Sequence, residues 1–486
     1  MRTSTAGVAA AAFAAFAAAR EMAVNMELKA EIYDSGVRHE QIMALKNQVW
    51  DELDEQGVYD STQYAKFDAQ VDSVTCTNGV AAYVPGDPKY AFRCKNLDLY
   101  DFKTHAQLGS ASGRGAGSWG WTSPLGREFV AIAQEDGTSF SEVTSKGKLI
   151  YLGRLPQYTT AAKSLWREIK GYKSYIVIGS EAEKHGVQIF DLSKLLDVDP
   201  ASPVVFSNER DLTGFWTEGL PLGRSHNVVT NEEKNYGVAT GFQPRNATLR
   251  AGLVFFDLTD PANPKTLGGT GQDGYVHDAQ CIVYRGPDTK YFGRDICYGY
   301  DEDALTIFDV SDKKSIKVIS NTSYEGASYT HQGWVLDPQW QQFLILDDEY
   351  DEVDEAGPAA DGYPVSYIWD VSSLEKPKQT GYYKGLRRGI DHNQYVHDGF
   401  SYQSNYALGL NILDLRSVPS DPTGKGIKEV AYFDTYPEDD KEPGGGNVTF
   451  TGTWSHYPFF PSGYIVINTM DRGAFVVKRS ANAIGW

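Results

Sequence analysis

The sequence GVQIFDLSK (residues 186–194) recurs along the chain in closely related forms. Each copy is an apolar, strand-like run, and most copies end in Asp, an apolar residue and Ser or Thr. Turns rich in Gly, Asp and Ser separate the copies, with no helical pattern between them. The other copies are GTSFSEVTS (137–145), GLVFFDLTD (252–260), ALTIFDVSD (304–312), SYIWDVSS (366–373), GLNILDLRS (409–417) and GAFVVKRS (473–480).

These repeats predict an all-β fold, namely a β-propeller. A small antiparallel sheet cannot bury both of its faces alone, so neighbouring sheets must stack. A spacing of roughly 45 to 65 residues fits a four-stranded blade with its loops, and the copies therefore predict seven blades. Six blades remain an alternative if the first or last copy completes another blade. A β-solenoid would have shorter repeats, and a pair of sandwiches would not repeat a phrase.

The first 70 residues depart from this pattern. Residues 1–19 contain a short Ala-rich apolar run and end in an A-x-A pattern, which predicts a secretory signal peptide. Residues 20–70 mix charge with apolar residues near a helical period, which predicts a helical extension that packs against or caps the propeller. His39 falls in this extension, and we assign it to no site. The propeller is then expected over 71–480, with a tail at 481–486.

The cysteines and sequons also indicate export, either into the secretory pathway or out of the cell. The four cysteines form two close pairs, and we expect one disulfide between Cys281 and Cys297 and another between Cys76 and Cys94. The N-x-S/T sequons, which predict a glycoprotein, stand at Asn246, Asn321 and Asn447.

The charge balance excludes some classes of partner. The chain of 486 residues has a formal net charge of −19, so nucleic acid or an anionic membrane would repel it. No apolar run is long enough for a comfortable membrane span. A hydrophobic content of 41% with 13% aromatic residues is ample for a large core. We expect small hydrophobic or conjugated molecules as partners instead.

Five of the nine histidines start strand-like segments at related points of the repeat. The first strand of each propeller blade lines the central channel, so matching positions should form a ring. The two remaining blades offer tryptophans at this point, with Arg167 beside one of them. The histidines of the predicted ring are His226, His277, His331, His392 and His456.

Such a ring has a structural and a functional interpretation. A single histidine more often ties blade to blade through backbone carbonyls. Five in register beside Asp278 and Arg167 favour a partly solvated pocket for acid–base chemistry. The aromatic residues expected to enclose an apolar substrate are Trp119, Trp121, Trp166, Trp334 and Tyr395, with His456.

Cofactors and metals are not predicted. The ring is expected to be too broad for one ion, and no familiar local metal spacing is present. The acidic run LDDEYDEVDE (346–355) offers oxygen ligands, but it lacks the glycine geometry of a dedicated calcium loop, so we interpret it as a solvated hairpin tip.

Several long motifs resemble the choice-of-anchor B, or LVIVD-repeat, family of secreted β-propellers. They include SLWREIKGYKSYIVIGSEAEKHGVQIFDLS, GYVHDAQCIVYRGPDTKYFGRDICY and DHNQYVHDGFSYQSNYALGLNILDL, and the resemblance covers about residues 70 to 480. It implies a propeller and export. The family has no common activity, and we transfer no catalytic residue from it.

Some fungal relatives are similar to hetero-Diels–Alderases of tropolone-sesquiterpenoid biosynthesis, a branch of secondary metabolism. The resemblance implies a cofactor-free pericyclase that joins a tropolone quinone methide to a humulene-type alkene. His226, His277, Asp278, His331, His392 and Arg167 are the expected catalytic groups. The alternative is a non-catalytic propeller that binds a protein or glycan outside the cell.

Overall fold

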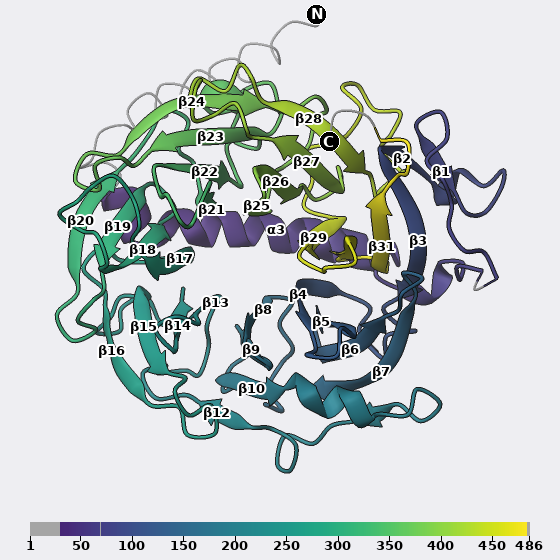
Figure 1. Cartoon of the computed structure of the whole chain (residues 1–486), viewed down its shortest axis with the longest axis horizontal. Helices are drawn as coiled ribbons and strands as arrows, with labels where there is room; N and C mark the ends of the chain where they lie inside the picture. The colour runs from purple at the N-terminus through teal and green to yellow at the C-terminus, as the bar shows by residue number, and fades with distance from the viewer. Residues whose placement is uncertain (1–29, 69, 484–486) are drawn as a thin grey trace, which may run out of the picture.

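The computed structural model describes residues 30–68 and 70–483. Within these residues, the strands form seven sheets around one axis, so the chain is a seven-bladed β-propeller. Figure 1 shows the sheets as a closed ring with helix α3 crossing behind its centre. The predicted fold class and blade number are confirmed. The predicted signal peptide, residues 1–19, lies outside the described residues.

The first four blades follow each other along the chain, each running outward from the axis. In blade 2 the chain passes through β11 (Val204–Val205) between β10 and β12, but β11 pairs in parallel with β7 of blade 1 and is not part of the blade 2 sheet. Blade 1 contains β4 (Gly115–Thr122), β5 (Glu128–Gln134), β6 (Gly137–Val143) and β7 (Leu149–Pro156); blade 2 contains β8 (Arg167–Tyr172), β9 (Tyr175–Ser180), β10 (Val187–Asp191) and β12 (Gly214–Trp216); blade 3 contains β13 (Asn227–Asn231), β14 (Tyr236–Thr240), β15 (Leu253–Asp257) and β16 (Thr266–Thr270); blade 4 contains β17 (Asp278–Val283), β18 (Asp295–Tyr300), β19 (Leu305–Asp309) and β20 (Lys317–Thr322).

The last three blades close the ring. Blade 6 is extended by β2 (Ala91–Lys95) and β1 (Val80–Ala82). Blade 7 takes its outermost strand, β3 (Leu97–Thr104), from the start of the propeller, so the two ends of the domain pair with each other. Blade 5 contains β21 (Thr330–Val335), β22 (Phe343–Asp348), β23 (Val365–Asp370) and β24 (Lys378–Lys384); blade 6 contains β25 (Asn393–His397), β26 (Phe400–Ser404), β27 (Leu410–Asp414) and β28 (Lys428–Phe433); blade 7 contains β29 (Thr453–Tyr457), β30 (Tyr464–Thr469) and β31 (Gly473–Arg479).

The repeated phrase is the third strand of each blade together with the turn that ends it. In five blades the aspartate that closes this strand accepts a hydrogen bond from the backbone N–H two residues later, at 2.7 to 3.1 Å. This is an Asx turn, and it explains why Asp recurs there. The apolar residue after each of these aspartates, such as Leu258 or Val310, is buried between blades.

Between residue 30 and the propeller, the helical elements are a π-helical turn (Ala30–Asp34), α3 (Val37–Glu55) and a 3₁₀ turn (Ser61–Gln63). Further 3₁₀ turns span Pro88–Tyr90, Leu192–Asp197 and Gly357–Ala359. The buried residues of α3 are His39, Ile42, Lys46 and Trp50, which share one helical face. Ile42 and Trp50 join a core cluster with Tyr350, Phe450 and Trp454 of the propeller. Helix α3 therefore packs against the propeller.

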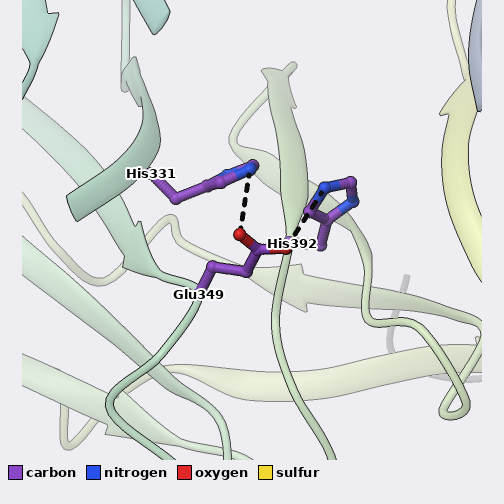
Figure 2. Close-up of side chains that lie close together, drawn as sticks. All are labelled: His331, Glu349 and His392. Carbon is purple, nitrogen blue, oxygen red and sulfur yellow. Dashed lines mark ion pairs between the residues drawn. The ribbon is translucent and has the colours of Figure 1, made fainter. Parts of the chain in front are cut away.

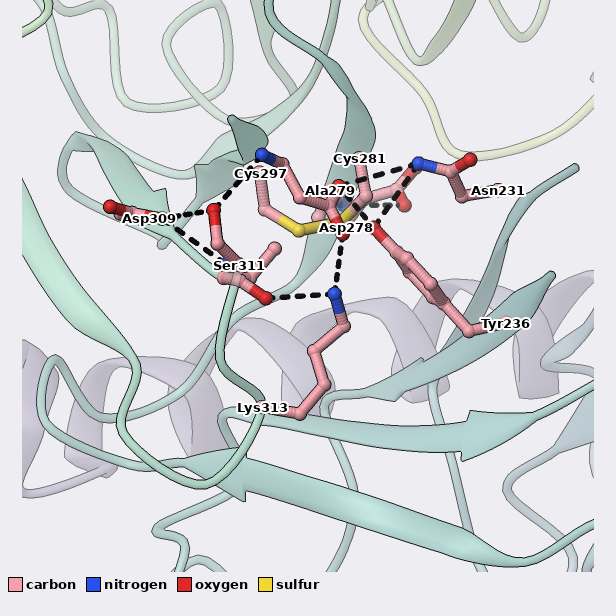
Figure 3. The surroundings of a disulfide bond; sticks show 11 residues. Asn231, Tyr236, Asp278, Ala279, Cys281, Cys297, Asp309, Ser311 and Lys313 are labelled. Atoms are coloured by element: carbon pink, nitrogen blue, oxygen red, sulfur yellow. Dashed lines mark hydrogen bonds and ion pairs between the residues drawn. A yellow bond between two sulfur atoms is a disulfide. The ribbon is translucent and has the colours of Figure 1, made fainter. Parts of the chain in front are cut away.

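Both expected disulfides are present, which is consistent with an extracellular protein. Cys281 and Cys297 face each other on β17 and β18, as Figure 3 shows. Cys76 is bonded to Cys94 of β2 and ties the chain that leads into the propeller to blade 6. No helix in the described part of the chain is long and apolar enough to cross a membrane.

The acidic run does not form a solvated hairpin tip. Asp347, Asp348, Glu349, Asp351 and Glu352 are all buried, so that expectation is wrong. The reason is tertiary: α3 and the start of blade 6 cover the turn that follows β22, as the contacts Tyr350 Oη to the Ile42 carbonyl and Gln394 Nε2 to Asp347 indicate. A sequence pattern cannot show that a distant helix covers a loop.

Candidate functional site

Four histidines from consecutive blades stack around the start of the channel. The ring centroids of His226 and His277 lie 4.3 Å apart, those of His277 and His331 4.1 Å, and those of His331 and His392 4.5 Å. Each residue stands at or just before the first strand of its blade, from blade 3 to blade 6. The expected ring therefore exists for these four, and all four are buried.

His456 is not part of this stack. The register shifts between Thr453 and Ser455 of β29 just as it shifts between Thr330 and Gln332 of β21, so Trp454 has in blade 7 the position that His331 has in blade 5. Trp454 accordingly packs on His392, with ring centroids 4.9 Å apart. His456 lies further along the strand and bonds Ser404 Oγ through Nδ1 at 2.7 Å. Its expected place in the ring was wrong, because the residue of blade 7 that matches His331 is Trp454, which stands two residues before His456.

Three of the four rings are held through Nδ1. His277 Nδ1 lies 2.8 Å from the His331 carbonyl oxygen, and His392 Nδ1 lies 2.9 Å from that of Trp454. A carbonyl can only accept, so both rings carry their proton on Nδ1 and keep the Nε2 lone pair free. His226 Nδ1 lies 2.6 Å from Glu181 Oε1.

Lys46 of α3 closes the channel over the histidines. Its ammonium donates to both oxygens of Glu349, at 2.7 and 2.6 Å, and Tyr406 Oη donates to Glu349 Oε1 at 2.5 Å. Glu349 Oε2 lies 3.8 Å from His331 Nε2, and Oε1 lies 3.8 Å from His392 Nε2, as Figure 2 shows. Glu349 therefore connects the helix to the histidines.

The space between these groups is too small for a substrate. It measures about 10 Å³ for the centre of a water-sized sphere, which is room for about one water molecule. Burial lowers the pKa of His392 to about 4 and lowers the pKa values of His277 and His331 well below their ordinary range. These three imidazoles are neutral at neutral pH, and the expected partial solvation of the ring is wrong, because α3 covers it.

The charges of the histidine layer do not require a metal ion. His331, Glu349 and His392 offer ligand atoms that lie within 4.8 Å of one another, so the ring is narrower than expected. Yet the Lys46 ammonium already neutralises Glu349. Burial alone would raise the pKa of Glu349, but Lys46 and His392 bring it below its ordinary value. The lysine thus stands where a bound cation would otherwise be needed.

Arg167 lies between blades. Its Nε donates to the Gln134 carbonyl at 3.0 Å, and one of its terminal nitrogens lies 2.6 Å from His185 Nε2. Burial lowers its pKa to about 10. Trp166 lies on the helix side, with its ring centroid 5.0 Å from that of Trp50. Trp121 stacks on Phe129 within blade 1, with ring centroids 5.6 Å apart.

Asp278 belongs to a second polar layer further along the channel. It accepts from Gln332 Nε2 at 3.0 Å, and Gln332 in turn accepts from the Gln394 backbone N–H at 2.5 Å. Burial raises the pKa of Asp278 to about 6, although Lys170 opposes this shift. The carboxyl can therefore gain or lose a proton near neutral pH.

Aromatic side chains beyond this layer surround Lys170 of β8. Lys170 Nζ lies 5.8 Å from the ring centroid of Trp119 and 5.9 Å from that of Tyr395. Tyr395 makes edge contacts with Trp119 and Trp334 at 5.7 and 5.2 Å, and Trp119 and Trp334 are partly exposed. The first strands begin at α3 and these residues lie nearer their ends, so this mouth is opposite the helix.

Lys170 is a buried, charged group at this mouth. Burial alone would lower its pKa, but Tyr395, Glu168 and Asp278 together raise it, so the ammonium persists at neutral pH. Glu168 Oε2 lies 3.7 Å from Lys170 Nζ, and Glu168 Oε1 accepts from Trp454 Nε1 at 2.9 Å. Glu168 thus links the aromatic mouth to the histidine layer.

Sequence reasoning missed Lys46, Glu349 and Lys170. Lys46 had a weak signal, since it stands four residues from both Ile42 and Trp50 on one helical face. Lys170 lies on β8, the first strand of blade 2, which begins at Arg167. Because side chains alternate along a strand, Lys170 points away from the face that Arg167 occupies and toward the channel. Nothing local distinguishes Glu349 from its acidic neighbours.

The fold and these layers define a class: a seven-bladed β-propeller, in the part of the chain described, with one mouth capped by a helix and the other lined with aromatic residues. No family model and no curated protein matches the chain. Among solved structures, the β-propeller domain of Cps50 (Swd1) from Myceliophteria thermophila is similar, with 10% identity and a TM-score of 0.42. The match covers 73% of this chain and 94% of that chain.

Proposed function

We propose that the protein is a cofactor-free enzyme of the hetero-Diels–Alder type that acts on a flat, conjugated substrate at the aromatic mouth of the channel. The observation that carries the proposal is the charged Lys170 under the rings of Trp119 and Tyr395, with the titratable Asp278 nearby. The resemblance to secreted propellers that include hetero-Diels–Alderase relatives supports the reaction type.

The aromatic residues suit two apolar reactants. Trp119 and Trp334 are partly exposed, whereas Tyr395 between them is buried. The two tryptophan side chains are therefore accessible from outside, and the tyrosine packs beneath them. A tropolone ring can stack on such walls and an alkene can pack beside it. Holding two reactants together lowers the entropic cost of a bimolecular step.

The polar groups suit the dehydration that precedes cycloaddition. A hydroxymethyl tropolone loses its side-chain hydroxyl and its ring hydroxyl proton as water, which leaves a quinone methide. Asp278 has a pKa near 6 and can carry a proton, and the Lys170 ammonium can donate a hydrogen bond to the ring oxygen. New C–C and C–O bonds to the alkene then form without any redox change.

The test incubates the purified protein with a hydroxymethyl tropolone precursor and humulene and measures adducts against the uncatalysed background. We expect Lys170→Met to reduce the catalysed rate by about 100-fold or more, because it removes the charged donor. Trp334→Ala should raise KM for the apolar partner. Trp216→Phe is the matched control, since Trp216 stands on the outermost strand of blade 2 and stacks on Phe256 of blade 3.

Two results would contradict this function. One is wild-type protein that gives no adduct above background with this substrate pair. The other is Lys170→Met protein that keeps the full rate. If the first result were accompanied by saturable binding of either molecule, the protein would be a binding propeller and not an enzyme.

A further inference from the structure

Three carboxylates from two blades meet in the interior beside the turn that follows β22. Asp351 and Glu352 belong to that turn in blade 5, and Asp391 lies just before β25 of blade 6. One oxygen of each residue lies within 4.8 Å of the others, which is close enough for one ion to contact all three. From this arrangement we infer that Asp351, Glu352 and Asp391 bind a single calcium ion.

All but one of the carboxylate oxygens of this cluster lack hydrogen-bond partners among the described residues. Asp351 Oδ2 accepts from Tyr367 Oη at 2.7 Å. Within the described residues, the other oxygen of Asp351 and both oxygens of Glu352 and of Asp391 have no hydrogen-bond partner, although the residues are only 0%, 2% and 1% exposed. A buried carboxylate without a partner costs several kcal/mol unless a proton or a cation neutralises it, and a bound cation would satisfy all of these atoms together.

The neighbouring acids show what a satisfied carboxylate looks like in this region. Asp348 accepts from the backbone N–H groups of Ser328 and Tyr329 and from Tyr324 Oη. Asp347 accepts from the Gln332 N–H and Gln394 Nε2. Hydrogen-bond donors thus reach Asp347 and Asp348, in contrast to the carboxylates of the Asp351 cluster.

Charge separates this cluster from the histidine layer. Glu349 has the Lys46 ammonium at hydrogen-bond distance, so its negative charge is balanced within the chain. The electrostatic influences on Asp391 come from Asp347, Asp348 and Glu349, which are all acidic. The histidine layer is neutral without a metal, whereas burial raises the pKa values of Asp351, Glu352 and Asp391 well above their ordinary range, so a bound cation would replace the protons that these three carboxyls otherwise hold.

The chemistry of the ligands selects a hard divalent cation. All three residues offer oxygen only, which disfavours zinc and copper. Each carboxylate can bind through one or two oxygens, which suits the six to eight ligands that Ca²⁺ takes. Mg²⁺ keeps several waters in octahedral geometry, and this buried site leaves little room for them.

A bound ion would join the turn after β22 to blade 6. The same turn carries the contacts that hold α3, namely Lys46 with Glu349 and Arg38 with Asp354. Calcium would therefore stabilise both the seam between blades 5 and 6 and the platform on which the capping helix lies.

The test compares thermal unfolding of the full chain in EDTA and in Ca²⁺. We expect Ca²⁺ at roughly 100 times its Kd to raise Tm by about 3 °C or more. Tb³⁺, a luminescent substitute for Ca²⁺, should show emission sensitised by Tyr367, which contacts Asp351, and Ca²⁺ should compete this emission away. Calorimetric titration should give one site per chain.

Asp391→Asn is the decisive variant. It removes one of three repelling charges, so its Tm in EDTA should match or exceed that of wild type, while the Ca²⁺ shift and the Tb³⁺ signal are lost. Glu352→Gln should show the same Tm in EDTA and the same loss of the Ca²⁺ shift and the Tb³⁺ signal. It replaces Asp391→Asn in the test if that variant does not fold. Asp301→Asn is the matched control, because Asp301 is a buried carboxylate with both oxygens unpartnered outside the cluster, and it should keep the full Ca²⁺ shift.

Equal Tm values for wild type in EDTA and Ca²⁺, with no sensitised Tb³⁺ emission, would overturn the site. A full Ca²⁺ shift in Asp391→Asn would also overturn it, and an equal shift with Mg²⁺ would overturn the assignment to calcium. If protons rather than a cation neutralise the cluster, wild-type stability relative to Asp391→Asn should rise as pH falls, with no response to Ca²⁺.

Discussion

Lys46 provides the positive charge that makes the histidine layer neutral as a whole. Its side chain is buried on the inner face of α3, and both oxygens of Glu349 accept from it. A buried ion pair of this kind adds little net stability, but loss of one partner leaves an uncompensated charge. The residue therefore couples α3 to the channel.

Replacing Lys46 by Met should lower the free energy of unfolding by about 3 to 5 kcal/mol, because Glu349 would stay buried without its cation. Urea unfolding followed by circular dichroism measures the change. The double variant Lys46→Met with Glu349→Gln should recover much of the loss. A single variant as stable as wild type would show that the pair is not formed.

His392 should make folding sensitive to acid. Burial lowers its pKa in the folded state to about 4, while the unfolded value is about 6.5. The unfolded chain then binds the proton more tightly, so the stability present above pH 6.5 is lost as pH falls toward 4. Raised carboxyl pKa values elsewhere have the opposite sign, so only a difference between variants isolates this histidine.

We expect wild type to lose about 3 kcal/mol relative to His392→Gln between pH 6.5 and pH 4. Unfolding in urea at a series of pH values measures this difference, and a constant difference across the range would contradict the pKa. The sequence alone favoured a partly solvated ring, whereas buried rings should matter for stability.

At the scale of elements, α3 behaves as a plug that packs on the face where the first strands begin. Trp50 donates through Nε1 to the Phe450 carbonyl at 2.8 Å and packs on Trp166. His39 Nδ1 lies 3.0 Å from Tyr329 Oη, and Tyr33 donates to the Ser328 carbonyl at 2.9 Å. These contacts hold the helix and the turn before it against the segments that lead into blades 2, 5 and 7.

Trp50→Ala should cost about 3 to 5 kcal/mol, the usual loss for a buried tryptophan, and should speed amide hydrogen exchange in α3 more than in the blades. Leu45→Ala is the control on the exposed face of the same helix, where the side chain is 39% exposed. It should change stability by no more than about 0.5 kcal/mol. Uniform exchange changes in all blades would show that α3 is no separate unit.

At the scale of the whole molecule, the ring is closed by pairing between chain segments from its two ends. Strand β3 pairs with β31, and Phe102 packs on Phe475 with ring centroids 4.5 Å apart. Seven stacked sheets in the described chain bury their faces only when this last seam is made.

Phe102→Ala should therefore cost about 3 to 5 kcal/mol and open blade 7 first, which hydrogen exchange of β3 and β31 would detect. Val205→Ala in β11 is the control, because that side chain is 66% exposed and far from the seam in sequence. Faster exchange in blade 4 than in blade 7 would contradict closure at β3.

The sequence by itself determined the propeller, its seven blades, the third-strand repeat, both disulfides and the stack of four histidines. These features follow from local patterns: strand alternation, an Asx turn in five of the seven phrases, and equal positions in equal repeats. Spacing failed at His456, because Trp454, two residues earlier, occupies the position in blade 7 that His331 occupies in blade 5.

Tertiary structure alone decided which of these groups meets solvent and which is paired. The helix that covers the histidines lies far from them along the chain, and Lys46 reaches Glu349 across 303 residues. The acidic run looked solvated in sequence, yet it is buried because α3 and blade 6 both cover it. Burial sets the dielectric environment and the available donors, and these depend on segments that no local pattern brings together.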